Sequence, residues 1–302
     1  MVERNSSDTA RYRVQSVERA LQLLGAFNQD ERQLALADLA ERVGIPRPTA
    51  FRLLSTLEAQ GFVRRVGTDY CLGFRCFVLG NVVKADLAIE REALPFLEAL
   101  RDVTGETTQL GILDGWQVVY LARVFSHLPV AYMRSRVGVV LPAYCTGLGK
   151  ALLAELPPEE VERWSRTQHF PRLTSATLTS PEELLANLAV IRRRGYALDQ
   201  EEREVGVACI AAVVRDDTGS PVAAISAAGP VDRLPRDLEG SEMATRVVTA
   251  AAGISERLGY VAQRTVAADT EPDPDGVVVQ CLLPCAPGTA PRVSRSCMVA
   301  AL

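Results

Sequence analysis

Long apolar segments are absent from this chain of 302 residues. No stretch of eighteen or more consecutive apolar residues occurs, so no segment has the length that crossing a membrane as a helix requires. The first residues are polar and charged and do not resemble the apolar core of a signal peptide. From these absences we expect a cytoplasmic protein without a membrane anchor.

Histidine and lysine are scarce. The chain holds two histidines, His127 and His169, and two lysines, Lys84 and Lys150. Most schemes of general acid–base catalysis and of nucleophile activation use one of these side chains, so the scarcity disfavours an enzyme. We expect both histidines to lie on the surface.

A disulfide framework and a strong metal motif are also missing. Seven cysteines, an odd number spread over both halves, fit a reducing compartment better than paired disulfides. Cys281 and Cys285 form a C-x3-C pair without further ligands, which indicates zinc only weakly. We therefore expect no metal and no other cofactor.

An overall excess of positive charge is lacking as well. Thirty-seven acidic residues against 33 lysines and arginines leave a net charge of −4. Such a chain does not coat nucleic acid along its length, so any DNA contact must come from a local basic patch. The length allows two domains, and a hydrophobic content of 48% is ordinary for a globular protein.

One segment, residues 34–73, carries the pattern of a helix-turn-helix. An apolar helical period ends at Gly44 and resumes after Pro48, which a first helical turn tolerates. Two short helices joined by a tight turn with glycine are typical of this motif. Two short strand-like runs follow around residues 66–69 and predict a hairpin wing. A helix over residues 14–27, with Ser16 as its N-cap, would complete a three-helix core.

Basic residues gather on this segment. Between residues 43 and 75 there are five arginines but only two acids. That local excess lies where DNA phosphates would lie in a winged helix-turn-helix. A purely structural helix-turn-helix that binds no DNA is the alternative. The predicted DNA-binding residues are Arg19, Arg47, Thr49, Arg52, Arg64 and Arg65.

The rest of the chain alternates strand-like and helical runs. Asp114-Gly115 is a hairpin signal between two alternating runs, and apolar strands are expected over residues 207–214 and 221–228. A helix over residues 180–194 has Ser180 as its N-cap and Glu183 at the capping-box position. This order predicts an α+β domain in which an antiparallel sheet is flanked by helices. The expected organisation is a disordered arm (1–13), a winged helix-turn-helix (14–75), a linker and dimerisation helix (76–90), an effector-binding domain (91–260) and a disordered tail (261–302).

Three segments together resemble the IclR family of bacterial transcriptional regulators. They are VQSVERALQLLGAF before the helix-turn-helix, and LPAYCTGLGKALLA and GYALDQEEREVGVACIAAVV in the second half. The resemblance covers about residues 14–260. It implies a winged helix-turn-helix joined by a linker helix to a GAF-like effector-binding domain. It also implies a homodimer or homotetramer on a palindromic operator, with repression and activation both left open.

The resemblance also implies an effector site. Gly147 and Leu148 would form a main-chain cradle for a carboxylate at the start of a helix. Where some members have a second serine, this chain has Ala228, so a small acid that used that hydroxyl would lose a hydrogen bond worth about 1 kcal/mol. That substitution favours a larger or aromatic acid. The remaining implied residues are polar at Asp199, Cys209 and Ser226, and apolar at Val130, Met133, Leu141 and Val207.

Other interpretations of the same residues remain. Cys145 and Cys209 also fit small buried side chains, and Asp199 lies in a charge run of the kind that usually forms a solvated loop. A cysteine-dependent enzyme would need Cys145 or Cys209 beside a histidine, but no nucleophile signature supports it. A ligand-sensing interaction protein, whose winged helix binds protein instead of DNA, is the other alternative.

Overall fold

The computed structural model describes residues 13–28, 31–86, 88–128 and 136–261. Almost all of the expected arm (1–13) and tail (261–302) falls outside these residues, as do Val130, Met133 and the cysteines near the C-terminus. No helix among the described residues is long and apolar enough to cross a membrane.

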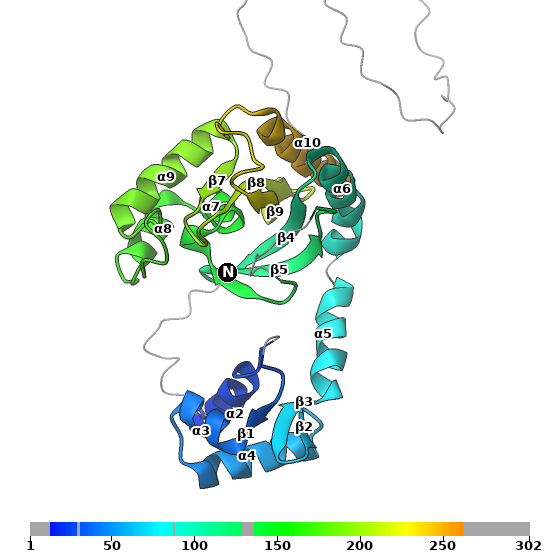
Figure 1. The fold of residues 1–302 in the computed structure, drawn as a ribbon, viewed down its shortest axis with the longest axis vertical. Helices are drawn as coiled ribbons and strands as arrows, with labels where there is room; N and C mark the ends of the chain where they lie inside the picture. Colours follow the sequence, from blue (N-terminus) through cyan, green and yellow to red (C-terminus); the bar gives the residue numbers. More distant parts are fainter. Residues whose placement is uncertain (1–12, 29–30, 87, 129–135, 262–302) are drawn as a thin grey trace, which may run out of the picture. The chain divides into compact units, whose positions relative to one another are not determined.

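The N-terminal part of the described chain is a winged helix-turn-helix (Figure 1). Its three-stranded antiparallel sheet has the order β1-β3-β2. The elements are α2 (Gln15–Gly25), β1 (Leu34–Ala35), α3 (Leu36–Val43), α4 (Arg47–Ala59), β2 (Val63–Val66) and β3 (Asp69–Leu72).

Local chemistry accounts for most of this part. Gly44 ends α3 with φ = 67°, a left-handed conformation that glycine adopts without a steric penalty. Pro48 occupies the first turn of α4, as predicted. The predicted N-cap was wrong: α2 begins after Val14, which makes no side-chain cap, and Ser16 lies inside the helix. Strand β1 was not predicted, because two residues carry no alternation to recognise.

Two helices follow the wing, α5 (Phe74–Asp86) and α6 (Ala88–Thr104). Sequence periodicity had extended the first to Glu90, but residues 88–90 belong to α6. Gly105, with φ = 75°, follows the end of α6 in the left-handed conformation that commonly terminates a helix.

The C-terminal part is built on a six-stranded antiparallel sheet with the order β6-β5-β4-β9-β8-β7. This confirms the α+β class and the flanked antiparallel sheet. The elements are β4 (Thr107–Asp114), β5 (Gln117–Val124), β6 (Val140–Pro142), the 3-10 turn η1 (Ala143–Cys145), α7 (Gly147–Leu153), α8 (Pro158–Ser165), α9 (Pro181–Arg194), β7 (Ala197–Gln200), β8 (Val207–Arg215), β9 (Pro221–Pro230) and α10 (Glu242–Arg257).

Helices cover both faces of the sheet (Figure 1). Helices α6 and α10 pack on one face, where Ile210 and Ile225 are fully buried. Helix α7, with α8 and α9 outside it, packs on the other face against Ala211 and Ala224. Side chains alternate between the faces along each strand, so small residues line the α7 face and let that helix approach closely.

Candidate functional site

Helix α4 exposes two arginines that have no internal partner among the described residues. Arg47 is the first residue of the helix and Arg52 lies farther along it; both are exposed and form no ion pair there. Thr49 between them is half-buried, and so is Arg19 on α2. Two exposed guanidinium groups on the second helix of a helix-turn-helix suit contact with DNA bases or phosphates.

The two wing arginines make internal contacts. The Arg65 guanidinium donates a 2.8 Å hydrogen bond to the Tyr70 hydroxyl and lies 5.8 Å from the centre of the Phe51 ring on α4. Arg64 lies 5.9 Å from the centre of the Phe74 ring. Arg65 therefore holds the wing against the second helix, in addition to any role at a phosphate.

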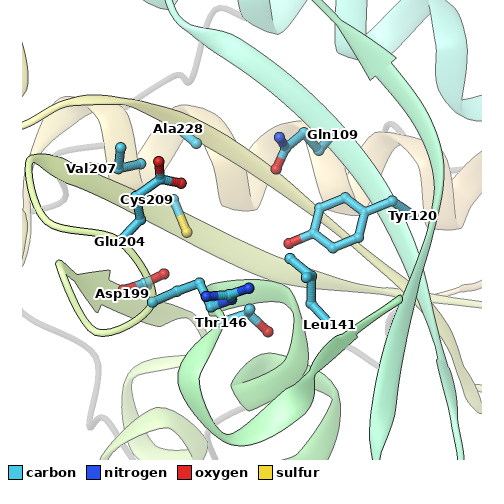
Figure 2. A pocket seen from close by; sticks show the side chains of 11 residues that line it. Gln109, Tyr120, Leu141, Thr146, Asp199, Glu204, Val207, Cys209 and Ala228 are labelled. Atoms are coloured by element: carbon cyan, nitrogen blue, oxygen red, sulfur yellow. The ribbon is translucent and has the colours of Figure 1, made fainter. Parts of the chain in front are cut away.

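A cavity of about 40 Å³ lies on the α7 side of the large sheet (Figure 2). In Figure 2 the Tyr120 hydroxyl and the Cys209 sulfur point toward the same space from different strands. The described residues that line the cavity are Gln109, Tyr120, Leu141, Thr146, Gly147, Asp199, Arg203, Glu204, Val207, Cys209 and Ala228.

Strand pairing and a close approach of backbone create this cavity. Asp199 on β7 is the register partner of Cys209 on β8, so both side chains point to the α7 face. A Cβ atom at Gly147 would lie 2.4 Å from the Cys209 sulfur, so glycine lets α7 begin at this distance from β8 while the Cys209 side chain keeps its position. The Thr146 hydroxyl accepts a hydrogen bond from the Gly149 N–H and caps the helix.

Five of the residues that the resemblance implied as the effector site line this single cavity: Leu141, Gly147, Asp199, Val207 and Cys209. Two others lie beside it in the structure. Leu148 is 1% exposed and packs in the apolar core, and Ser226 is fully buried and donates a 3.3 Å hydrogen bond to the Gln109 side chain.

The sequence analysis did not predict five residues that line the cavity: Gln109, Tyr120, Thr146, Arg203 and Glu204. Gln109 carried a recognisable signal, since it is a polar side chain in an otherwise apolar strand. Arg203 and Glu204 carried none, because they sit in a charge run that is typical of an exposed loop.

Asp199 is buried, with 8% of its surface exposed, and is not in a solvated loop. Burial raises the pKa of its carboxyl to about 7, the charge of Glu202 adds to the effect, and Lys150 opposes it. Lys150 is fully buried and forms an ion pair with Glu202, whose pKa is also raised by burial. A proton is therefore present on Asp199 in much of the population near neutral pH.

The thiols and the tyrosine hydroxyl in and near the cavity are neutral donors. Burial raises the pKa of the Cys145 thiol to about 12, and it also raises the pKa values of the Cys209 thiol and the Tyr120 hydroxyl. His127 and His169 are exposed, as expected. Neutral buried thiols are poor nucleophiles, which weighs against the cysteine-dependent enzyme. Among the described residues, no group of three or more histidine, cysteine or acidic side chains is placed to hold a metal ion.

Known proteins match both parts of the chain. Residues 16–67 match the IclR helix-turn-helix domain, and residues 82–256 match the bacterial transcriptional regulator IclR C-terminal domain. The HTH-type transcriptional regulator XynR of Escherichia coli (strain K12) is 36% identical over 252 residues, which are 82% of this chain and 99% of XynR. The transcriptional repressor IclR of the same organism is 34% identical over 251 residues, 82% of this chain and 90% of that protein.

Solved structures agree with these matches. A putative transcriptional regulator from Rhodococcus sp. RHA1 has a TM-score of 0.67 at 32% identity and covers 82% of this chain and 98% of its own. An IclR homolog from Microbacterium hydrocarbonoxydans, complexed with 4-hydroxybenzoate, has a TM-score of 0.70 at 29% identity and covers 80% and 98%. This chain belongs to the IclR family of DNA-binding bacterial transcriptional regulators.

Proposed function

We propose that a small organic carboxylate binds in the cavity beside α7 and changes the affinity of the winged helix-turn-helix for a palindromic operator. One observation carries this proposal. Five residues implied as effector contacts come from separate elements, β6, α7, β7 and β8, and line one cavity. Polar donors converging on a concave, partly apolar space are typical of a ligand site.

Cavity chemistry supports an organic acid. Arg203 supplies a cation, and Tyr120 and Cys209 supply neutral donors for the oxygen atoms of a ligand. The 4-hydroxybenzoate in the Microbacterium homolog is a carboxylate as well, and it supports the same class of ligand here.

Cavity volume bears on the size of the acid. About 40 Å³ between the described residues has room for about three water molecules. An acid of two to four carbons enters with little rearrangement, whereas an aromatic acid requires lining side chains to move. We therefore place small acids first and keep aromatic acids, which Ala228 favours, as the second class to test.

Helix α5 supports a homodimer or homotetramer. Its exposed apolar side chains include Phe74, Phe77, Val78 and Val82, which follow a helical period and form one stripe. Such a stripe is typical of a surface that a second copy covers. Two subunits would present two α4 helices, and half-sites of a palindrome one helical turn apart are about 34 Å in separation.

The test measures whether an acid bound in the cavity changes the affinity of the winged helix-turn-helix for DNA. Purified protein selects duplexes from a random DNA pool, and fluorescence anisotropy of a selected duplex then measures affinity with and without glyoxylate, pyruvate, benzoate or 4-hydroxybenzoate. We expect one of these acids to change the affinity for DNA at least fivefold, because coupling energies of about 1 to 3 kcal/mol are usual between linked sites. If every acid leaves both the thermal midpoint and the DNA affinity unchanged, the proposed effector class is wrong.

A further inference from the structure

Arg203 is the cation among the described residues that line the cavity. Its side chain is half-buried and lines the cavity, and within the described part of the chain its Nε atom is enclosed without a hydrogen-bond partner. No acid among the described residues forms an ion pair with it, although Asp199 and Glu204 line the same cavity. A desolvated guanidinium nitrogen without a partner is costly, so an anion that reaches it is strongly favoured.

Other arginines of the C-terminal part show what Arg203 lacks. Arg233 bonds Glu106 through two nitrogens, at 2.9 and 2.6 Å, and Arg215 bonds Glu155 at 2.7 Å. These guanidinium groups are satisfied inside the fold. Arg203 keeps its bonding capacity for a molecule that enters the cavity.

The main-chain cradle expected at Gly147 and Leu148 is less open than the resemblance implied. The Gly147 backbone packs directly against Cys209, where an added Cβ atom would lie 2.4 Å from the sulfur, and Leu148 packs in the apolar core without lining the cavity. Among the described residues, the positive group that lines the cavity is therefore the guanidinium of Arg203.

The loop that bears Arg203 is held in place from two sides. Glu201 has φ = 63°, the single positive φ of a residue other than glycine among the described residues, and its carboxylate accepts a 2.6 Å hydrogen bond from the Gly206 N–H. Thr174 and Thr177 donate hydrogen bonds of 2.6 and 2.7 Å to the carbonyl oxygens of Glu201 and Glu202. A strained conformation that is fastened this way positions the next side chain before any ligand arrives.

We infer that Arg203 binds the carboxylate of the effector and sets the charge specificity of the cavity, so that carboxylic acids bind and their uncharged amides do not. This inference rests on the proposed function. A planar guanidinium matches the two oxygens of a carboxylate, whereas an amide presents one acceptor and no charge. The role belongs to the side chain of Arg203 itself and does not depend on the size of the acid.

Calorimetry of the full-length protein tests the inference with two probe pairs, pyruvate against pyruvamide and 4-hydroxybenzoate against 4-hydroxybenzamide. Arg203→Gln removes the charge, and Arg203→Lys keeps the charge without the planar fork. Arg193→Gln is the matched control, because Arg193 is an exposed arginine of α9 that does not line the cavity. The thermal midpoint of each variant verifies folding.

We expect Arg203→Gln to weaken binding of the acid at least tenfold, Arg203→Lys to weaken it less, and Arg193→Gln to leave it unchanged. The amide should bind wild type and Arg203→Gln equally weakly. If Arg203→Gln binds the acid as wild type does, or the amide binds wild type as well as the acid does, the role of Arg203 is wrong while the proposed function stands. If wild type binds neither acid at millimolar concentration, the proposed function fails for these classes, and the inference fails with it.

Discussion

The Asp199 carboxylate accepts a hydrogen bond of 2.9 Å from the backbone N–H of Glu202. This bond connects Asp199, the buried acid of β7, to the loop that carries Arg203. The Glu202 side chain turns away to Lys150 on α7, so one short segment connects the cavity floor to a buried ion pair. The charge state of Asp199 is therefore coupled to how well this loop is held.

Stability should fall as pH rises, through Asp199. Burial raises the pKa of its carboxyl to about 7 in the folded protein, against about 3.9 in an unfolded chain. Between these values the folded state binds more protons than the unfolded state, so unfolding free energy decreases with pH. Ionisation of buried Asp199 lowers the unfolding free energy by its full amount above about pH 7 and has no effect below about pH 4. Urea unfolding at pH 5 and pH 8 should show a contribution of about 2 to 3 kcal/mol in wild type that Asp199→Asn lacks.

Asparagine is the matched replacement, since its side-chain oxygen can still accept the Glu202 N–H. The informative quantity is the difference between wild type and variant, because other groups titrate in both proteins. Equal pH dependence in the two would show that Asp199 is ionised in the folded state throughout this range.

Gly147→Ala should destabilise the C-terminal part and abolish acid binding. The added Cβ atom would lie 2.4 Å from the Cys209 sulfur, too close for any real contact, so either the buried Cys209 side chain rotates or α7 moves away from β8. We expect a loss of about 1 to 3 kcal/mol in thermal or urea unfolding.

Cys209→Ala in the same chain is the suppressor. It removes the sulfur and leaves Ala211, at 3.4 Å from the new Cβ, as the next contact. The double variant should recover much of the stability lost in Gly147→Ala. No recovery would mean that the clash is not the reason for glycine at this position.

Arg52→Ala and Arg47→Ala should weaken DNA binding without affecting stability. Both side chains are exposed on α4 and lack ion pairs among the described residues, so removing them breaks no internal contact. If one of them contacts a phosphate, the slope of log affinity against log salt should fall by about 1. Anisotropy over a salt series with a selected duplex measures this, with Arg193→Ala as the control. A salt-independent complex would instead favour a protein partner for the winged helix.

Arg65→Ala should behave differently from the α4 variants. It removes the hydrogen bond to the Tyr70 hydroxyl and the contact with Phe51, so it should lower thermal stability as well as DNA affinity. The thermal midpoint from circular dichroism distinguishes a structural role of Arg65 from a role in DNA contact alone. A loss of DNA affinity with an unchanged midpoint would assign Arg65 to the DNA alone.

Phe77→Glu should shift the protein toward monomer. Phe77 is 69% exposed on α5 within the apolar stripe, and a carboxylate buried there in a dimer interface would carry a large desolvation cost. Sedimentation velocity measures the change. Val248→Glu, at an exposed apolar position of α10, is the control that should not alter the mass. An unchanged mass for Phe77→Glu would remove α5 from the interface.

Local signals explain what could be predicted of the fold. The Ser180 hydroxyl accepts from the Glu183 N–H at 3.2 Å, as the capping sequence indicates, and Asp114-Gly115 closes the β4–β5 hairpin. Each signal lies within a few residues of the structure it forms. Helix and strand starts that lack such a signal, as at Ser16 and β1, were the ones missed or misplaced.

The sequence by itself determined most of the elements, the helix-turn-helix with its wing and the family. Each of these features depends on short sequence patterns, such as apolar periodicity, helix caps and turn residues. Tertiary structure alone decided the cavity. Gln109 meets Ser226 only because β4 pairs with β9, across 117 positions of chain, and Asp199 is buried only because β7 pairs with β8. Burial and the partners of a charge depend on packing between distant segments. A charge run that looks solvated can therefore supply a buried carboxyl with a raised pKa and a cation that forms no ion pair among the described residues.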